Sequence, residues 1–103
     1  MPAIWIAHTR PKDASVERDH LTFLNGTHRD ELLRAIPEVT SYATYRETLP
    51  EGGGRFLSIG RADTLTAAEL GARIAAAGAD LTPMPFVSLE EGEAPFLLFA
   101  DEA

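Results

Sequence analysis

Two different hydrophobic periods run along this chain, and the change from one to the other marks out its elements. In residues 21–35 one helix face, at steps of three or four residues, carries Leu21, Leu24, His28, Leu32 and Ala35. Pro37 ends this helix, because proline lacks an amide N–H and disfavours helical geometry in the residue before it. From Val39 the period becomes two. We therefore predict a helix that leads directly into a strand, with one histidine on its apolar stripe.

Four segments have the composition of strands. Residues 39–47 are rich in β-branched and aromatic side chains, and residues 3–8 and 96–100 are short runs dominated by apolar side chains. Residues 55–61 carry the strand formers Phe56, Leu57 and Ile59 between two arginines. A connection rich in proline and glycine joins the segment at 39–47 to the one at 55–61. This connection predicts an antiparallel hairpin.

The first predicted helix extends on both sides of the apolar stripe. Ser15 is placed to cap its start, and the helical pattern continues to about Ile36. An Asn25-Gly26 pair lies in the middle, where glycine costs about 1 kcal/mol relative to alanine. We expect any bend or break of this helix at that pair.

A second helix is predicted after the hairpin. Thr66 and Glu69 have the spacing of a capping box, and Gly78 is expected to end the helix. The helix is rich in alanine and therefore slim, so it should pack close to a sheet. Residues 79–95 contain three prolines and predict an irregular connection.

The order strand, helix, strand, strand, helix, strand is that of a ferredoxin-like α+β fold. Such a domain has a four-stranded antiparallel sheet with both helices on one face, and residues 1–103 are the length of a single domain of this kind. Because the predicted strands are apolar on both faces, the helices leave one apolar face uncovered. We expect a homodimer in which two sheets pack face to face.

Composition excludes several partners. Nine basic and sixteen acidic residues give a net charge of −7 without a basic stripe, which argues against binding to nucleic acid or to an anionic membrane surface. The chain has no cysteine, which excludes disulfides and thiolate metal sites. No run is apolar over the length of a membrane span, and no segment has the pattern of a signal peptide. We expect a cytoplasmic protein.

His28 is the first candidate for chemistry. Its place between Leu24 and Leu32 predicts burial, which lowers the pKa of an imidazole and keeps it neutral near pH 7. A neutral imidazole in an apolar pocket could abstract a proton from an activated carbon acid, followed by isomerisation or ring closure, without a cofactor. The alternative is a core histidine bonded to a backbone carbonyl.

Two further side chains are candidates for a second polar group beside His28. His8 ends the first strand, where it could either approach His28 or cap the strand at the surface, and Tyr45 lies on the second strand. His20 stands among charged residues and is expected to be solvated. The three histidines lack the spacings of metal ligands, so we expect no metal and no cofactor.

A family resemblance supports this organisation. Residues 23–46 contain a series of features in a fixed order: an aromatic residue, a histidine five positions later, a Leu-Leu pair, an Ile-Pro turn and a strand ending in Tyr-Arg. The residues concerned are Phe23, His28, Leu32, Leu33, Ile36, Pro37, Tyr45 and Arg46. This segment resembles the helix-to-strand region of dimeric α+β barrel proteins, particularly the EthD-like group. The resemblance implies a homodimeric barrel and a histidine at position 28, in a fold that hosts monooxygenases, isomerases, cyclases and haem enzymes.

Two functions from different classes fit these observations. In the first, a homodimer binds or acts on a small hydrophobic or aromatic metabolite in a pocket around His28, between the sheet and the first helix, lined by Trp5, Phe23, Leu24 and Leu32. In the second, the chain is a non-catalytic accessory or binding protein. A cavity of about 300 Å³ or more that reaches His28 would favour the first function, and a filled interior the second.

Overall fold

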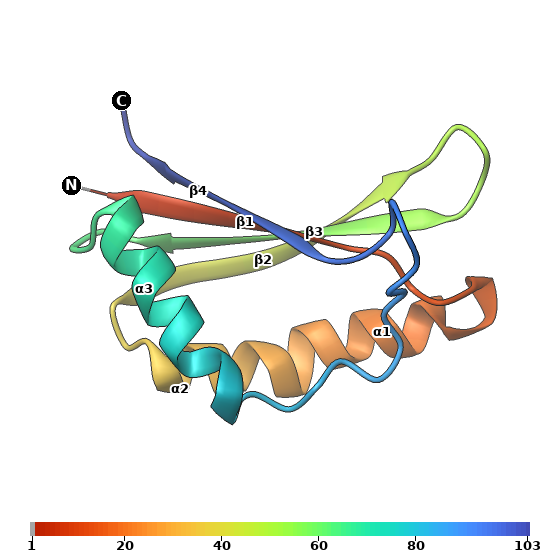
Figure 1. Cartoon of the computed structure of the whole chain (residues 1–103), viewed down its shortest axis with the longest axis horizontal. Coiled ribbons are helices and arrows are strands. Elements are labelled where there is room, and N and C mark those ends of the chain that lie inside the picture. The colour runs from red at the N-terminus through yellow and green to blue at the C-terminus, as the bar shows by residue number, and fades with distance from the viewer. Residues whose placement is uncertain (1) are drawn as a thin grey trace.

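A computed structural model describes residues 2–103 as a four-stranded sheet with its helices on one face (Figure 1). The irregular segment that follows the last helix returns to the edge of the sheet. The elements in chain order are β1 (Ala3–Thr9), α1 (Glu17–Phe23), α2 (Arg29–Ala35), β2 (Val39–Thr48), β3 (Gly54–Ala62), α3 (Ala67–Ala77) and β4 (Phe96–Asp101).

The sheet has the predicted topology. Its strand order is β2-β3-β1-β4, and each of the three neighbouring pairs is antiparallel. β2 and β3 form the predicted hairpin, in which Tyr42 lies opposite Gly60. The ferredoxin-like fold class is therefore confirmed, and each strand begins and ends within two residues of its predicted bounds.

The first helix is continuous from α1 through α2, with a π turn in its middle. This turn, η2 (Leu24–His28), includes the Asn25-Gly26 pair, the position at which any bend or break was expected. The amide of Arg29 reaches back to the carbonyl of Leu24, five residues earlier, whereas an α-helix spans four. One extra residue is accommodated here, directly before α2.

The start of this helix differs from the prediction. Ser15 is not its cap, because it lies within a short 3₁₀ turn, η1 (Ala14–Val16), that precedes α1. The Asp13 carboxylate accepts a hydrogen bond of 2.8 Å from the Ser15 amide and caps that turn instead. Because a single 3₁₀ turn precedes the α-helix, the capping residue is Asp13, two residues before the predicted Ser15.

The second helix begins and ends at the predicted residues, with Gly78 as its C-terminal cap. Glu69 donates its amide to the Thr66 hydroxyl at 3.1 Å, and the Thr66 amide donates to the Glu69 carboxylate at 2.9 Å, so the capping box is confirmed. Gly78 has a right-handed φ of −55°, so it does not terminate the helix in the left-handed conformation. The chain instead continues through a 3₁₀ turn, η3 (Gly78–Asp80).

Trp5 fixes which face of the sheet meets the helices. Its side chain is 1% exposed and lies across Gly60 on the neighbouring strand, where a Cβ would come within 2.0 Å of the indole ring. Only glycine leaves room for the ring at this position. Tyr42 packs beside the indole with 5.9 Å between the ring centroids, and Phe99 lies opposite Trp5 on β4.

The other face of the sheet carries apolar side chains that no described element covers. Ile6 lies between Ile59 and Leu98 in one row, and the side chain of Leu98 is 53% exposed. In the next row His8 stacks on Phe96, with 4.2 Å between the ring centroids. We call this surface the outer face. Among residues 2–103, no helix is long and apolar enough to cross a membrane.

Candidate functional site

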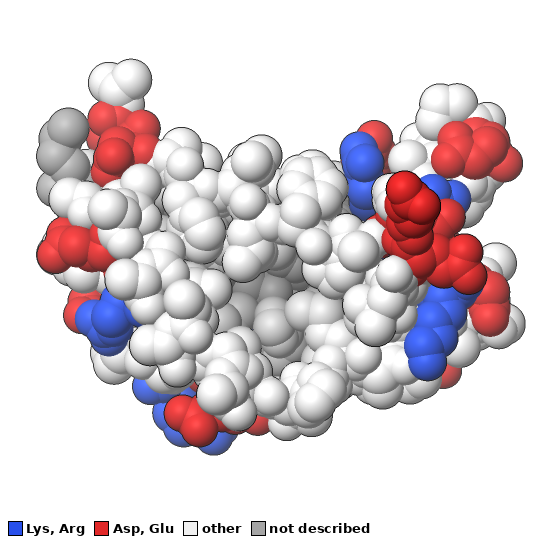
Figure 2. All heavy atoms as spheres, in the orientation of Figure 1, with Lys and Arg blue, Asp and Glu red and all other residues white. Residues whose placement is uncertain are grey.

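A cavity of about 420 Å³ lies between the inner face of the sheet and the helices. Figure 2 shows it as a hollow in the middle of a face made of uncharged side chains, with charged groups at the two ends of the molecule and along its lower edge. Its walls come from β1, β4, η2, α2, α3 and the connection at 81–95. The lining residues are Trp5, Ala7, Thr9, His28, Leu32, Gly71, Ile74, Ala75, Gly78, Leu81, Met84, Pro95, Leu97 and Phe99.

The chemistry of these walls is almost wholly apolar. None of the described lining residues is a lysine, arginine, aspartate or glutamate, and the side chains with hydrogen-bonding N or O atoms are Thr9, His28 and the indole of Trp5. A charged ligand would lose its hydration here without gaining a countercharge, at a cost of several kcal/mol. The cavity is therefore suited to an uncharged molecule.

His28 lies in this cavity wall at the end of the π turn. The side chain is 8% exposed, and Nδ1 is enclosed without a hydrogen-bond partner among the described residues. Burial lowers the pKa of His28, and the nearby Glu31 carboxylate opposes this only in part. The imidazole is therefore neutral near pH 7. Phe23 flanks it, with 6.1 Å between the two ring centroids.

Comparison with known proteins supports the fold and leaves the function open. No family model and no curated protein matches the sequence. Among solved structures, the crystal structure of an EthD family protein from Bacillus halodurans C-125 is similar over the whole of both chains, with a TM-score of 0.59 and 19% identity. The chain has an EthD-like fold. The de novo designed protein Foldit4 is similar too, over the whole of both chains, with a TM-score of 0.62 and 8% identity. Since a designed protein shares it, the EthD-like fold by itself implies no reaction.

Within this EthD-like fold, His20 is a second buried histidine that the sequence analysis placed wrongly. It is fully buried, and its Nε2 shares a hydrogen bond of 2.9 Å with the hydroxyl of Thr9 on β1. Burial lowers the pKa of His20, and the neighbouring His28 lowers it further. Its charged neighbours in sequence suggested solvent exposure. The four-residue spacing from His20 to Leu24 to His28 was the better signal, since it puts all three on one helix face.

His8 and Tyr45 are not brought to the cavity. Both lie opposite Leu57, one from each neighbouring strand, so they belong to the outer face with it. Strand alternation explains this placement, because β1 turns Trp5, Ala7 and Thr9 inward and His8 outward. Burial lowers the pKa of His8; Arg55 lowers it further and Glu47 opposes this. Thr9 is the polar group that accompanies His28.

The cavity is also displaced from the predicted pocket. Trp5 and Leu32 line it as predicted, whereas Phe23 and Leu24 do not. Leu24 is 1% exposed and lies in the core outside the cavity walls. The far wall comes from α3, where Gly71 and Ala75 have side chains too small to fill the space against the sheet.

The connection at 81–95, which we call the strap, closes one side of the cavity. At its start the Glu31 carboxylate accepts two hydrogen bonds of 2.9 Å, from the amide and the hydroxyl of Thr82. Further along, the amide of Ser88 donates to the carbonyl of Arg10 at 2.7 Å. Met84 lines the cavity from the segment between these two attachments.

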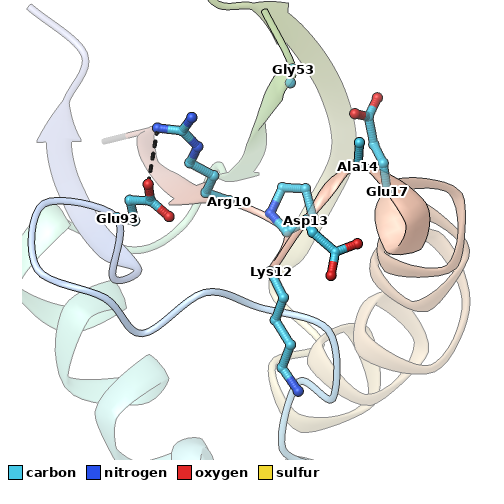
Figure 3. A pocket seen from close by; sticks show the side chains of 9 residues that line it. Arg10, Lys12, Asp13, Ala14, Glu17, Gly53 and Glu93 are labelled. Carbon is cyan, nitrogen blue, oxygen red and sulfur yellow. Dashed lines mark ion pairs between the residues drawn. The ribbon is translucent and has the colours of Figure 1, made fainter.

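A second, smaller pocket of about 140 Å³ opens beside η1 (Figure 3). Its walls include Arg10, Lys12 and Glu93, and Figure 3 shows Lys12 turned away from Arg10. Arg10 is already paired with Glu93 at 3.5 Å and with Glu51 at 3.6 Å. Its charge is therefore satisfied within the protein. Across residues 2–103, no group of three histidine, aspartate or glutamate side chains is placed to hold a metal ion.

Proposed function

We propose that this protein binds a small, uncharged hydrophobic or aromatic molecule in the cavity, with His28 as a polar group that meets it. The observation that carries the proposal is an apolar cavity of about 420 Å³ that reaches this buried histidine. Ligand sites commonly have volumes of about 300–1,000 Å³, with mostly apolar walls and a few convergent polar groups. The unfilled interior supports ligand binding over a purely accessory role.

The reaction class that fits this site is one that needs no cofactor. A neutral imidazole can serve as a base or as a hydrogen-bond donor toward an activated carbonyl compound, as in proton abstraction or isomerisation. His28 would be the side chain on which such an activity depends. If the His28→Ala protein retained full activity on the true substrate, that role would be excluded.

We further propose that two copies associate through the outer face. Three features support this: the apolar row of Ile6, Ile59 and Leu98, the exposure of Leu98, and the absence of any described element over that face. An isolated chain would leave this apolar surface in water, and its burial in a dimer would stabilise the fold by roughly 25 cal/mol for each Å² covered.

Ligand binding can be tested by filling the cavity from α3. The Ala75→Leu substitution adds a large apolar side chain at a lining position, and Ala76→Leu adds the same group at an exposed neighbouring position that does not line the cavity. Native mass spectrometry should detect a small molecule that copurifies with the original protein and with Ala76→Leu. Ala75→Leu should have lost it.

Thermal shifts provide the second readout. A neutral aromatic compound at 100 times its dissociation constant should stabilise the protein by about 2.7 kcal/mol, and Ala75→Leu should reduce this effect while Ala76→Leu does not. If no neutral compound raised the melting temperature, or if both variants responded alike, the cavity would not be a binding site.

The oligomeric state is tested by sedimentation velocity at micromolar concentration. Leu98→Lys places a charge on the outer face and should produce monomers, whereas Ala68→Lys on the exposed surface of α3 should leave the dimer intact. A stable monomer of the unaltered chain at that concentration would contradict the proposed association.

A further inference from the structure

The protonation of the two buried histidines can be assigned from what surrounds them. In both His20 and His28, Nδ1 is enclosed and has no hydrogen-bond partner among the described residues. A buried N–H group without an acceptor is a rare and costly arrangement, while an unmatched lone pair is tolerated more often. The neutral form that avoids the unmatched N–H carries its proton on Nε2. Both rings are therefore assigned the Nε2–H tautomer.

This tautomer fixes the direction of the hydrogen bond between His20 and Thr9. The Nε2–H group of His20 donates, and the hydroxyl oxygen of Thr9 accepts, over 2.9 Å. A hydroxyl that accepts in this way keeps its own hydrogen available to donate. Since Thr9 lines the cavity, that hydrogen can be offered to a ligand there.

The same assignment changes what His28 can do. Its Nδ1 is closed off, so the ring can exchange hydrogen bonds with a cavity ligand only through Nε2, which is not among the enclosed unpartnered atoms. With the proton on Nε2, that edge is a donor and has no lone pair with which to accept a proton. His28 and Thr9 thus supply two uncharged donors in the wall of a mostly apolar cavity.

We infer that the cavity selects neutral ligands whose polar group is a hydrogen-bond acceptor, namely the carbonyl oxygen of a ketone, quinone, lactone or ester, held by Thr9 and His28. His20 is the positioning residue, because its Nε2–H group turns the Thr9 hydroxyl into a donor toward the ligand. This inference rests on the proposed function, since it names the ligand class of the same cavity. If both donors reached one carbonyl oxygen, they would also stabilise negative charge that develops on that oxygen.

The tautomers can be measured without any ligand. Long-range ¹H–¹⁵N correlation spectra distinguish Nε2–H from Nδ1–H imidazoles, and both His20 and His28 should give the Nε2–H pattern at pH 7.5. An Nδ1–H pattern for His28 would overturn the inference, because its Nε2 would then be an acceptor. An Nδ1–H pattern for His20 would remove the reason for Thr9 to act as a donor, and would overturn it too.

Ligand preference is measured by calorimetry with matched pairs. The compounds are acetophenone and 2-acetylnaphthalene, each compared with the hydrocarbon in which an isopropyl group replaces the acetyl group at nearly the same size. Each ketone should bind about tenfold more tightly than its hydrocarbon, as expected for two ordinary hydrogen bonds. Equal binding of ketone and hydrocarbon would overturn the inference and leave the proposed function standing. Failure of all four compounds to bind would overturn both.

Variants identify the groups that create the preference. Thr9→Val removes the hydroxyl at constant shape and should reduce the preference for ketones to about threefold, the share of the remaining bond from His28, while hydrocarbon binding persists. Thr9→Ser should retain the full preference. His20→Gln keeps a donor near the position of Nε2 and should retain the preference, and His20→Leu should reduce it as Thr9→Val does. Trp5 fluorescence shows whether each variant is folded. Full ketone preference in folded Thr9→Val would overturn the assignment of that hydroxyl.

Discussion

Replacement of Gly60 by alanine should displace Trp5, because the added methyl group would occupy space that the indole ring already fills. An ideal Cβ at this position lies 2.0 Å from Cη2 and 2.1 Å from Cζ3 of the ring. Carbon atoms in contact are normally about 3.5–4.0 Å apart, so ring and strand must separate by roughly 1.5 Å. Tyr42 packs beside the ring on the neighbouring inner-face position. The free space available to the indole is the cavity that it lines.

Two consequences follow for stability and binding. Overpacking of a core typically costs about 1–3 kcal/mol, and in a domain of this size each kcal/mol lowers the melting temperature by roughly 4–8 °C. We expect Gly60→Ala to melt about 5–20 °C below the original protein. A ring that moves into the cavity also reduces its volume, so ligand binding should weaken in the same variant.

The assay uses a natural reporter, since Trp5 is the single tryptophan of the chain. Thermal unfolding followed by its fluorescence gives the melting temperature, and the emission maximum reports whether the ring has become more solvated. Gly26→Ala is the control, because a Cβ at Gly26 meets nothing within 4 Å. Its melting temperature should be unchanged or higher, by the helix propensity of alanine. The steric reasoning would be refuted if Gly60→Ala unfolded within about 2 °C of the original protein with unchanged emission.

Further predictions concern pH, a helix cap and the strap. Burial lowers the pKa values of His20 and His28 in the folded state, so on acidification the unfolded chain takes up protons first. The free energy of unfolding, measured with urea, should therefore decrease as the pH falls below about 6.5. The decrease should be up to about 1.4 kcal/mol per histidine per pH unit. No loss between pH 7 and 5 would contradict their burial. Thr66→Ala should cost about 1 kcal/mol in the same assay, and Thr66→Ser much less. Glu31→Ala removes both bonds to Thr82 and should speed amide exchange at residue 82, whereas unchanged exchange would argue against that attachment.

Much of the fold was predictable because each element carries a local signal. Strand composition and one capping box located the elements, and the element order left few topologies to consider. The choice of inner face was not predictable, because Ile4 and Trp5 are both apolar and period two alone does not rank them. Gly60 decides which face is the inner one, because the indole of Trp5 on β1 lies close to the backbone of Gly60 on β3. This contact follows from the register of the two strands, which the sequence alone does not give.

The site was predictable in part for the same reason. His28, Trp5 and Leu32 were found from the helical stripe and the strand pattern, and the structure places all three in the cavity wall. The burial of His20 was not predicted, because its charged neighbours in sequence indicated solvent exposure. Its position on the same helix face as Leu24 and His28 was the signal that indicated burial. The wall from α3 was also missed. The alanine-rich composition of this helix suggested close packing against the sheet, whereas Gly71 and Ala75 lie beside open space.

The π turn has a consequence for the ancestry of this chain. A π turn takes up one residue more than an α turn, so deletion of one residue from 24–28 would restore a regular helix while both halves keep their faces against the sheet. The bond from His20 to Thr9 would be kept, and the change would be confined to the turn itself, which places His28 in the cavity wall. Homologues that differ by a one-residue gap at this point should therefore have diverged in what they recognise, even where the rest of the sequence aligns without interruption.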